Sequence, residues 1–244
     1  MNDEHTHAEL AVTVDLAVFT VRAGLLQILL IERAEEPFAS YWALPGGFVK
    51  TTESVSNAAR RELCDETGLT NIDLHLEQLA TYGTPTRDPR MRVISVAHVA
   101  LIPDLPLPTA GGDAISARFW PVDELKLTVK SDLDAIPLAF DHAQIVTDAI
   151  ERVRSKLEYT TLATAFVSEP FSLSEVRRVY EAVWGKAPDL ANFRRKLLST
   201  QDFVVPAGGA STSGSKGGRP AALYRRGSAK RLHPPILRSD SFKD

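Results

Sequence analysis

Residues 46–69, which read GGFVKTTESVSNAARRELCDETGL, decide the fold of this chain. A strand-like start leads into a polar loop, and a helical run over 54–67 is then closed by a glycine at the position typical of a helix C-cap. Nine residues keep the fixed spacing G-x5-E-x7-R-E-L-x-D-E-x-G-L: Gly47, Glu53, Arg61, Glu62, Leu63, Asp65, Glu66, Gly68 and Leu69. Because so many positions at set intervals rarely coincide by chance, the stretch predicts a functional site on a strand–loop–helix unit.

Three acidic side chains share one face of this predicted helix. Glu62, Asp65 and Glu66 stand at positions i, i+3 and i+4. Carboxylates this close raise one another's pKa values, and a hard divalent cation such as Mg²⁺ or Mn²⁺ relieves their repulsion. A solvated acidic face is the alternative, but small apolar residues continue the same stripe towards the start of the helix. We therefore expect the carboxylates to form the rim of a groove that can hold a metal.

The stretch resembles the Nudix box, the signature of proteins that bind or cleave a nucleoside diphosphate linked to another group. The resemblance implies that four residues build the loop–helix–loop: Gly47, Glu53, Arg61 and Gly68. It also implies a metal site at Glu62, Asp65 and Glu66, with Glu62 and Glu66 catalytic if the protein is a hydrolase.

Three departures from the box argue against efficient hydrolysis. Asp65 stands where the family has Glu, so one ligand arm is shorter by a methylene. Lys50 and Thr52 stand where hydrolases similar to GGFVE-x-GES have an acid and a glycine. Lys50 brings a positive charge to the loop, and Thr52 lacks the freedom of glycine at positive φ. These departures favour a ligand-binding domain over an enzyme.

Strand-like runs surround the box and predict the fold class. Residues 11–49, 76–84, 91–102 and 119–121 contain apolar runs rich in β-branched and aromatic residues, separated by turn residues. MRVISVAHVALI is apolar enough for a central strand that is covered on both faces. Strands interrupted by helices predict an α/β (α+β) fold, here an α/β/α sandwich of the Nudix type over residues 1–135.

The segment YGTPTRDPRMR between two of these strands is the predicted effector site. Its Asp-Pro turn presents Arg87 and Arg90, and the planar guanidinium of arginine suits bidentate phosphate recognition. On spacing alone, an exposed loop with surface arginines is an equal alternative. Because RDPRMRVISVA resembles the corresponding stretch of ADP-ribose-handling Nudix proteins, we expect ADP-ribose as the ligand, bound by Arg87, Asp88 and Arg90.

The charge of the chain is divided unequally along its length. The 244 residues carry a net charge of −3, but residues 1–189 hold 17 Lys and Arg against 28 Asp and Glu, a net of −11. Residues 190–244 hold 11 against 3, a net of +8. A basic disordered tail explains part of this excess, but not the basic residues inside a helical pattern. The asymmetry therefore predicts a nucleic-acid-binding end.

The C-terminal third has the element order of a winged helix-turn-helix domain, expected over residues 159–228. Ser172 and Glu175 form a capping box at the start of a helix that ends before Gly185, and Asp189 caps the next helix. DFVV and AALYRR then predict two strands around a Gly/Ser-rich wing. A linker helix over 136–158 precedes the domain, and residues 229–244 are expected as a disordered tail.

The linker helix carries a further pattern. Asp141 and Gln144 stand at capping-box spacing, and apolar residues spaced 4, 3 and 4 form a seam: Val146, Ile150, Val153 and Leu157. The seam fits packing within its own domain and a dimer contact equally well.

The helix after Asp189 is the predicted recognition helix. Leu190, Phe193 and Leu197 occupy one side and are expected in the domain core. The polar residues and those of the wing can read bases and bind phosphates. They are Asn192, Arg194, Arg195, Lys196, Lys216 and Arg219.

The chain from about residue 10 to 226 is similar to the NrtR family, the Nudix-related transcriptional regulators of NAD metabolism. The similarity rests on the Nudix box, the FDH helix start, SEPFSLSEVRRVYEAVWG, NFRRKLL and GRPAALYRR. It implies a homodimeric repressor of NAD-biosynthesis genes that binds double-stranded operator DNA and releases it when ADP-ribose occupies the Nudix domain. The alternative is an active metal-dependent ADP-ribose pyrophosphatase with an accessory basic domain.

From the remaining composition we expect a cytoplasmic protein. The start MNDEHTHAEL is polar and acidic, unlike a secretory signal, and no apolar run is long enough for a membrane span. The single cysteine, Cys64, forms no internal disulfide, which suits a reducing compartment.

Overall fold

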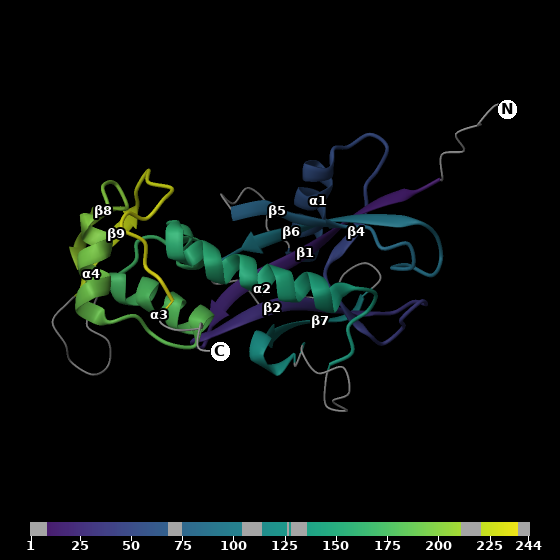
Figure 1. The fold of residues 1–244 in the computed structure, drawn as a ribbon, viewed down its shortest axis with the longest axis horizontal. Coiled ribbons are helices and arrows are strands. Elements are labelled where there is room, and N and C mark those ends of the chain that lie inside the picture. Colours follow the sequence, from purple (N-terminus) through teal and green to yellow (C-terminus); the bar gives the residue numbers. More distant parts are fainter. Residues whose placement is uncertain are drawn as a thin grey trace. The chain divides into compact units, whose positions relative to one another are not determined.

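The computed structural model describes residues 9–67, 75–103, 114–125, 127, 136–210 and 221–238. The chain packs into two compact units (Figure 1). The first unit contains Met1–Phe19, Ile28–Ala100 and Pro106–Ala149, and the second contains Thr20–Gln27, Leu101–Leu105 and Ile150–Asp244. No helix among the described residues is both long and apolar enough to cross a membrane.

A seven-stranded sheet, counted over the described residues, organises the N-terminal part of the chain. Its main path runs β3 (Trp42–Ala43), β2 (Leu25–Arg33), β1 (Ala11–Arg22), β6 (Val93–Leu101) and β5 (His75–Tyr82). In addition, β4 (Gly46–Phe48) pairs with β1, and β7 (Ala114–Pro121) pairs with β2. The middles of β1 and β2 and most of β6 are buried, as expected for strands covered on both faces.

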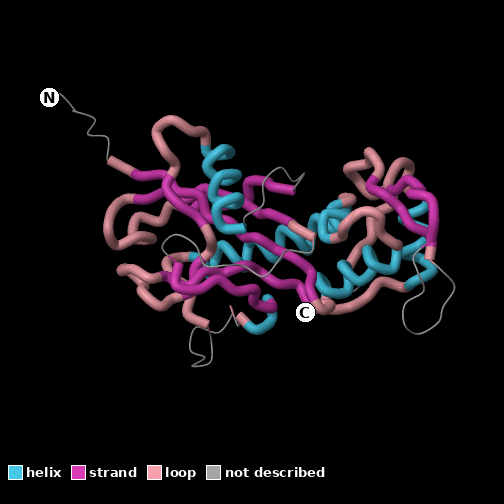
Figure 2. Tube along the Cα trace, turned by 180° about the vertical axis from the view of Figure 1, so that it is seen from behind, coloured by secondary structure: helices cyan, strands magenta, loops and turns pink. Residues whose placement is uncertain are grey.

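Helix α1 (Val55–Thr67) and the first half of α2 (His142–Tyr159) lie on opposite faces of the sheet, seen from its two sides in Figures 1 and 2. Buried Ala58, Ala59 and Leu63 form the inner side of α1. A short 3₁₀ turn, η1 (Val122–Glu124), follows β7. The α/β sandwich expected from the sequence is therefore confirmed.

The C-terminal part consists of short helices followed by a β-hairpin. A 3₁₀ segment, η2 (Leu162–Phe166), leads to α3 (Leu173–Trp184) and α4 (Leu190–Ser199). Strands β8 (Val204–Ala210) and β9 (Ala222–Arg226) then pair antiparallel. This order is the winged helix-turn-helix order expected from the sequence. The predicted wing residues Lys216 and Arg219 lie outside the described residues.

The capping residues predicted from the sequence define the starts of α3 and α4 and the end of α3. The Ser172 hydroxyl accepts a hydrogen bond from the Glu175 amide, and the Glu175 carboxylate accepts one from the Ser172 amide. Gly185 closes α3 with a φ of 73°, which favours glycine, and the Asp189 carboxylate accepts a hydrogen bond from the Asn192 amide at the start of α4. The predicted capping box and caps are confirmed.

The start of α2 differs from the expected capping box. The Asp141 carboxylate accepts two hydrogen bonds from Arg87, and the Gln144 side chain donates to Asp148. All four seam residues are buried within the chain: Val146, Ile150, Val153 and Leu157. The interpretation of the seam as packing within its own chain is therefore the one that the structure supports.

The recognition helix differs from expectation at one core position. Phe193 and Leu197 are buried, but Leu190 is 58% exposed. Leu190 is the first residue of α4, and the apolar face of α3 covers the helix only from the next turn onward.

Candidate functional site

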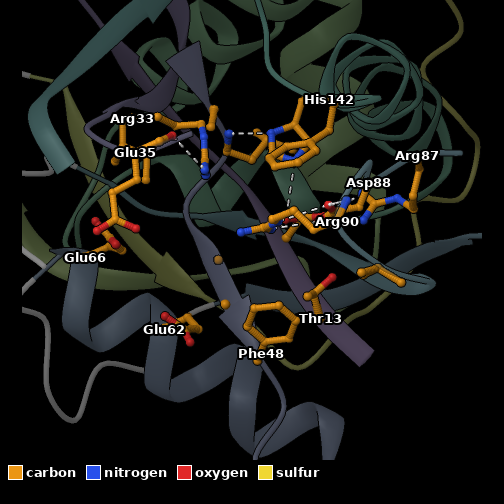
Figure 3. A pocket seen from close by; sticks show the side chains of 18 of the residues that line it. Thr13, Arg33, Glu35, Phe48, Glu62, Glu66, Arg87, Asp88, Arg90 and His142 are labelled. Atoms are coloured by element: carbon orange, nitrogen blue, oxygen red, sulfur yellow. Dashed lines mark hydrogen bonds and ion pairs between the residues drawn. The ribbon is translucent and has the colours of Figure 1, made fainter. Parts of the chain in front are cut away.

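A cavity of about 480 Å³ opens in the first unit and gathers the residues that the sequence singled out (Figure 3). Its lining comes from β1, β2, β4, α1, the loop before β6 and the start of α2. The three acidic residues of α1 and the three residues of the predicted effector site all line it: Glu62, Asp65, Glu66, Arg87, Asp88 and Arg90.

The loop before α1 is braced by one arginine. Arg61 donates two hydrogen bonds to the Glu53 carboxylate, at 2.7 and 3.1 Å, and a third to the Phe48 carbonyl at 3.2 Å. Hydrogen bonds from Arg61, followed by that from the Lys50 amide, lower the pKa of Glu53 to about 2. Glu53 is therefore ionised and engaged in the loop.

Close approach explains the glycine that precedes this loop. A Cβ atom at Gly47 would overlap the carboxylate of Glu62, and one at Gly46 would overlap the Val14 carbonyl across the β1–β4 pair. The two glycines thus let β4 lie against β1 while the acidic face of α1 comes close to its backbone.

The acidic face itself is uneven. Glu62 accepts a 2.6 Å hydrogen bond from Arg61, whereas the Asp65 side chain is 65% exposed. Burial, with the charges of Glu62 and Asp65 in second place, raises the pKa of Glu66 to about 7. In the described parts of the chain, no group of three or more His, Cys, Asp and Glu residues is arranged to hold a metal ion. Arg61 engages Glu62 and the Asp65 side chain is largely exposed, and the metal site expected at Glu62, Asp65 and Glu66 stays a prediction.

Arg87 lies at the centre of an ion network in the wall of the cavity. It donates to both oxygens of Asp141, at 2.7 and 2.9 Å, and to Asp15 at 3.2 Å, with its own side chain only 4% exposed. Burial tends to lower the pKa of Arg87, but the hydrogen bonds and charges of the two aspartates outweigh it and raise the pKa. Arg87 therefore ties β1 to the residue that precedes α2.

His142 completes the network from the first turn of α2. Its Nδ1 accepts a hydrogen bond from the Leu44 amide at 2.9 Å, and its Nε2 lies 3.5 Å from Asp15. Burial lowers the pKa of His142, so the ring is neutral near pH 7. With Nδ1 accepting, the proton belongs on Nε2, facing Asp15.

The mouth of the cavity combines cations with an aromatic ring. Asp88 is buried and accepts two side-chain hydrogen bonds from Arg90, at 2.8 and 3.0 Å. The Arg90 side chain is 45% exposed. The guanidinium groups of Arg90 and Arg33 lie 5.8 and 5.0 Å from the centre of the Phe140 ring. Phe140 holds a φ of 53°, uncommon for a bulky residue, and its ring packs 4.8 Å from that of Phe38. Such a strained position beside a cavity is typical of a functional site.

The predicted DNA-binding residues of α4 separate into two groups. Asn192, Arg194 and Arg195 are exposed, and Arg195 donates to the Asn192 side chain at 2.9 Å. Arg194 lines a second cavity of about 450 Å³ beside the start of α3. Lys196 instead donates a 2.6 Å hydrogen bond to the Pro235 carbonyl. Its ammonium group is therefore engaged within the protein.

Sequence reasoning missed the residues that come from distant parts of the chain. These residues are Asp15, Arg33, Phe140, Asp141 and His142. The last three form the FDH stretch that carried part of the family similarity, but no motif of the sequence assigned them to the site.

Two families match consecutive parts of the chain. Residues 11–140 match the NUDIX domain, and residues 163–226 match the NrtR DNA-binding winged helix domain. The chain is 35% identical over 217 residues to the ADPR responsive transcriptional repressor NtrR of Acinetobacter baylyi, covering 87% of this chain and 80% of that protein. It is 42% identical over 123 residues to an ADP-ribose pyrophosphatase of Methanocaldococcus jannaschii, covering 50% of this chain and 64% of that protein.

Solved structures agree with this assignment. NrtR of Shewanella oneidensis complexed with a 27mer DNA superimposes with a TM-score of 0.76 and 30% identity, over 93% of this chain and 99% of that one. The NUDIX domain of the same protein, complexed with ADP ribose, gives a TM-score of 0.52 and 30% identity, over 62% and 94%. The resemblance drawn from the sequence is confirmed: this chain belongs to the NrtR family, with a Nudix domain followed by an NrtR-type winged helix domain.

Proposed function

We propose that this protein is a transcriptional repressor whose second unit binds operator DNA and whose first unit binds ADP-ribose as the signal for release. The regulated genes are those of NAD biosynthesis or salvage, and the site of action is the cytoplasm. Family membership and the chemistry of the first-unit cavity both support the proposal.

The observation that carries the proposal is the position of α2. His142, in its first turn, lines the cavity of the first unit. Its second half is hydrogen-bonded to α3, because Arg154 donates to the Val183 carbonyl and Tyr180 donates to the Leu157 carbonyl. One helix thus contributes to the ligand cavity and to the DNA-binding unit. Ligand binding at its start can therefore act along one continuous helix and, through these hydrogen bonds, on α3.

Within the cavity, the three predicted effector residues take different roles. Arg90 is the half-exposed cation that can reach a diphosphate, and buried Asp88 orients it. Arg87 is too deeply engaged with Asp15 and Asp141 to serve as a free phosphate ligand. It acts by holding the start of α2, and Phe140 offers a ring for stacking.

DNA recognition falls to the exposed face of α4 and to the wing. Asn192, Arg194 and Arg195 supply the donors for bases and phosphates, and Lys216 and Arg219 of the wing supply further charge. Two subunits of a homodimer would place two such helices one DNA turn apart on a palindromic operator. ADP-ribose would favour a dimer geometry in which this spacing no longer fits.

Fluorescence anisotropy tests the proposal. Labelled DNA from upstream of the host's NAD-biosynthesis genes is titrated with the protein, with scrambled DNA as control, in the presence and absence of ADP-ribose. Selective binding that ADP-ribose reverses is expected. Equal binding to both DNAs with no response to ADP-ribose would refute the proposal.

A second candidate is ADP-ribose hydrolysis, favoured by the 42% identity over 123 residues to an ADP-ribose pyrophosphatase. Release of AMP in the presence of Mg²⁺ or Mn²⁺, abolished in Glu66→Gln, would support it. The engaged Glu62, the exposed Asp65 and the nearby Lys50 argue for at most slow turnover. An AMP release rate equal to that of the Glu66→Gln control would exclude this second activity.

A further inference from the structure

The chain beyond the winged helix hairpin is an ordered segment that contacts two helices of the second unit. Residues 229–238, here called the C-terminal strap, were expected as part of a disordered tail. Instead, Leu232 and Ile236 of the strap are only 5% and 4% exposed. Their amides donate to the carbonyls of Tyr159 and Glu158 at 2.9 Å each. The strap therefore packs along the C-terminal end of α2.

Arg238 fastens the end of the strap to the second half of α2. It donates to Glu158 at 2.8 Å and to Glu151 at 2.7 Å, so one guanidinium joins residues two turns apart on the same helix. The side chains of Arg238 and Glu158 are only 21% and 14% exposed, although that of Glu151 is 57% exposed. Because both side chains of the Arg238–Glu158 pair are largely buried, we expect this pair to contribute more to stability than an exposed ion pair does.

The middle of the strap holds the last turn of the recognition helix. Lys196 donates to the Pro235 carbonyl at 2.6 Å, and the Thr200 hydroxyl donates to the His233 carbonyl at 3.3 Å. These are the residues at which α4 ends. The strap thus contacts α2 on one side and α4 on the other within ten residues of chain.

We propose that the C-terminal strap couples α2 to the recognition helix, with Arg238 and Lys196 as positioning residues that transmit the ADP-ribose signal to DNA affinity. This inference rests on the proposed function. Displacement of α2 by ligand would pull on the strap through Arg238, and the strap would move the end of α4 through Lys196. The match to the NrtR DNA-binding winged helix domain covers residues 163–226, and the strap follows it in the chain.

The proposal gives Lys196 a role different from that of its neighbours in α4. A cation that contacts a DNA phosphate contributes about 0.9 to the slope of log K against log salt concentration. Arg195→Gln should therefore lower that slope by about one, whereas Lys196→Met should leave it unchanged and reduce the response to ADP-ribose.

The test compares Arg238→Gln with Arg231→Gln in the full-length protein. Both changes remove one positive charge from the strap, but Arg231 is exposed and lies outside the contacts with the two glutamates. DNA affinity is measured by anisotropy with and without saturating ADP-ribose, and the ratio of the two dissociation constants gives the coupling. ADP-ribose affinity of the free protein is measured by calorimetry. It should be the same in both variants, because the cavity lies in the first unit.

A loss of fold in Arg238→Gln is separated from a loss of coupling by a second variant. Glu151→Gln, Glu158→Gln and Arg238→Gln combined remove both ion pairs and leave no carboxylate unpaired. Thermal melting establishes that each variant is folded.

Coupling at least about fivefold weaker in Arg238→Gln and in the triple variant, with Arg231→Gln like the wild type, supports the strap. Equal coupling in all four proteins overturns it, as does a lowered salt slope in Lys196→Met. The proposed function is refuted if the wild-type protein does not bind ADP-ribose, or if ADP-ribose does not change its affinity for operator DNA. In either case the inference about the strap is refuted as well.

Discussion

Replacement of Glu66 by glutamine should stabilise the protein at alkaline pH. Burial and the neighbouring carboxylates raise the pKa of Glu66 from 4.5 to about 7. At 1.36 kcal/mol for each pH unit, this rise corresponds to roughly 3 kcal/mol, which water around the half-buried group reduces to about 2 kcal/mol. Because the folded-state pKa is the higher one, the contribution of Glu66 to stability is complete below pH 4.5 and is lost as the pH rises through 7.

Glu66→Gln should therefore exceed the wild type by about 2 kcal/mol at pH 8 and by less than about 1 kcal/mol at pH 5. Urea unfolding measures the difference through Trp42 and Trp120 of the first unit, with Trp184 replaced by Phe in every protein compared. Glu124→Gln, at an exposed position, is the control. Equal unfolding free energies of the two variants at pH 8 would refute the raised pKa of Glu66.

Three further changes probe other parts of the molecule. Arg87→Met leaves the buried Asp15 and the part-buried Asp141 without their cation, and it should lower the unfolding free energy by about 3 kcal/mol in urea titrations at pH 7. A loss below about 1 kcal/mol would show that the network is dispensable. Ser172→Ala removes the cap of α3 and should cost about 1 kcal/mol, measured as a lower melting temperature of the second unit. An unchanged melting temperature would argue against the capping box as a stabilising element. Arg195→Gln should weaken operator binding and lower its salt slope by about one, whereas an unchanged slope would place Arg195 away from phosphate.

Local patterns carried most of the fold. Helix α1, the capping box at Ser172 and the cap at Asp189 each depend on residues within four positions of one another. Their chemistry is therefore readable from sequence alone. The fixed spacing of the first motif likewise placed Glu62 and Glu66 together at one cavity.

The contacts between distant residues could not be read in this way. Arg87 meets Asp15 across 72 positions and Asp141 across 54, and no local pattern ties these residues together. Asp141 shows the consequence: its spacing to Gln144 predicted a helix cap, but a buried arginine competes for the carboxylate and wins. A long-range ion pair thus overrode a local propensity.

Basic composition misled in a related way at the C-terminus. The charged residues and prolines after residue 228 are typical of a disordered tail. Leu232, Ile236 and Arg238 nevertheless form hydrogen bonds to residues of α2. Lys196 looked like a phosphate ligand because its neighbours are basic, yet its partner is a carbonyl 39 positions away. Charge alone therefore does not separate DNA contacts from contacts inside the protein.

If ADP-ribose is the release signal, DNA must in turn lower the affinity of the protein for ADP-ribose. Binding free energies of two coupled ligands are linked, so each must weaken the other by the same factor. Calorimetry of ADP-ribose binding is carried out with the free protein and with the protein saturated by operator DNA. We expect a weaker ADP-ribose affinity in the complex, by the factor with which ADP-ribose weakens DNA binding. The same ADP-ribose affinity in both states would contradict it.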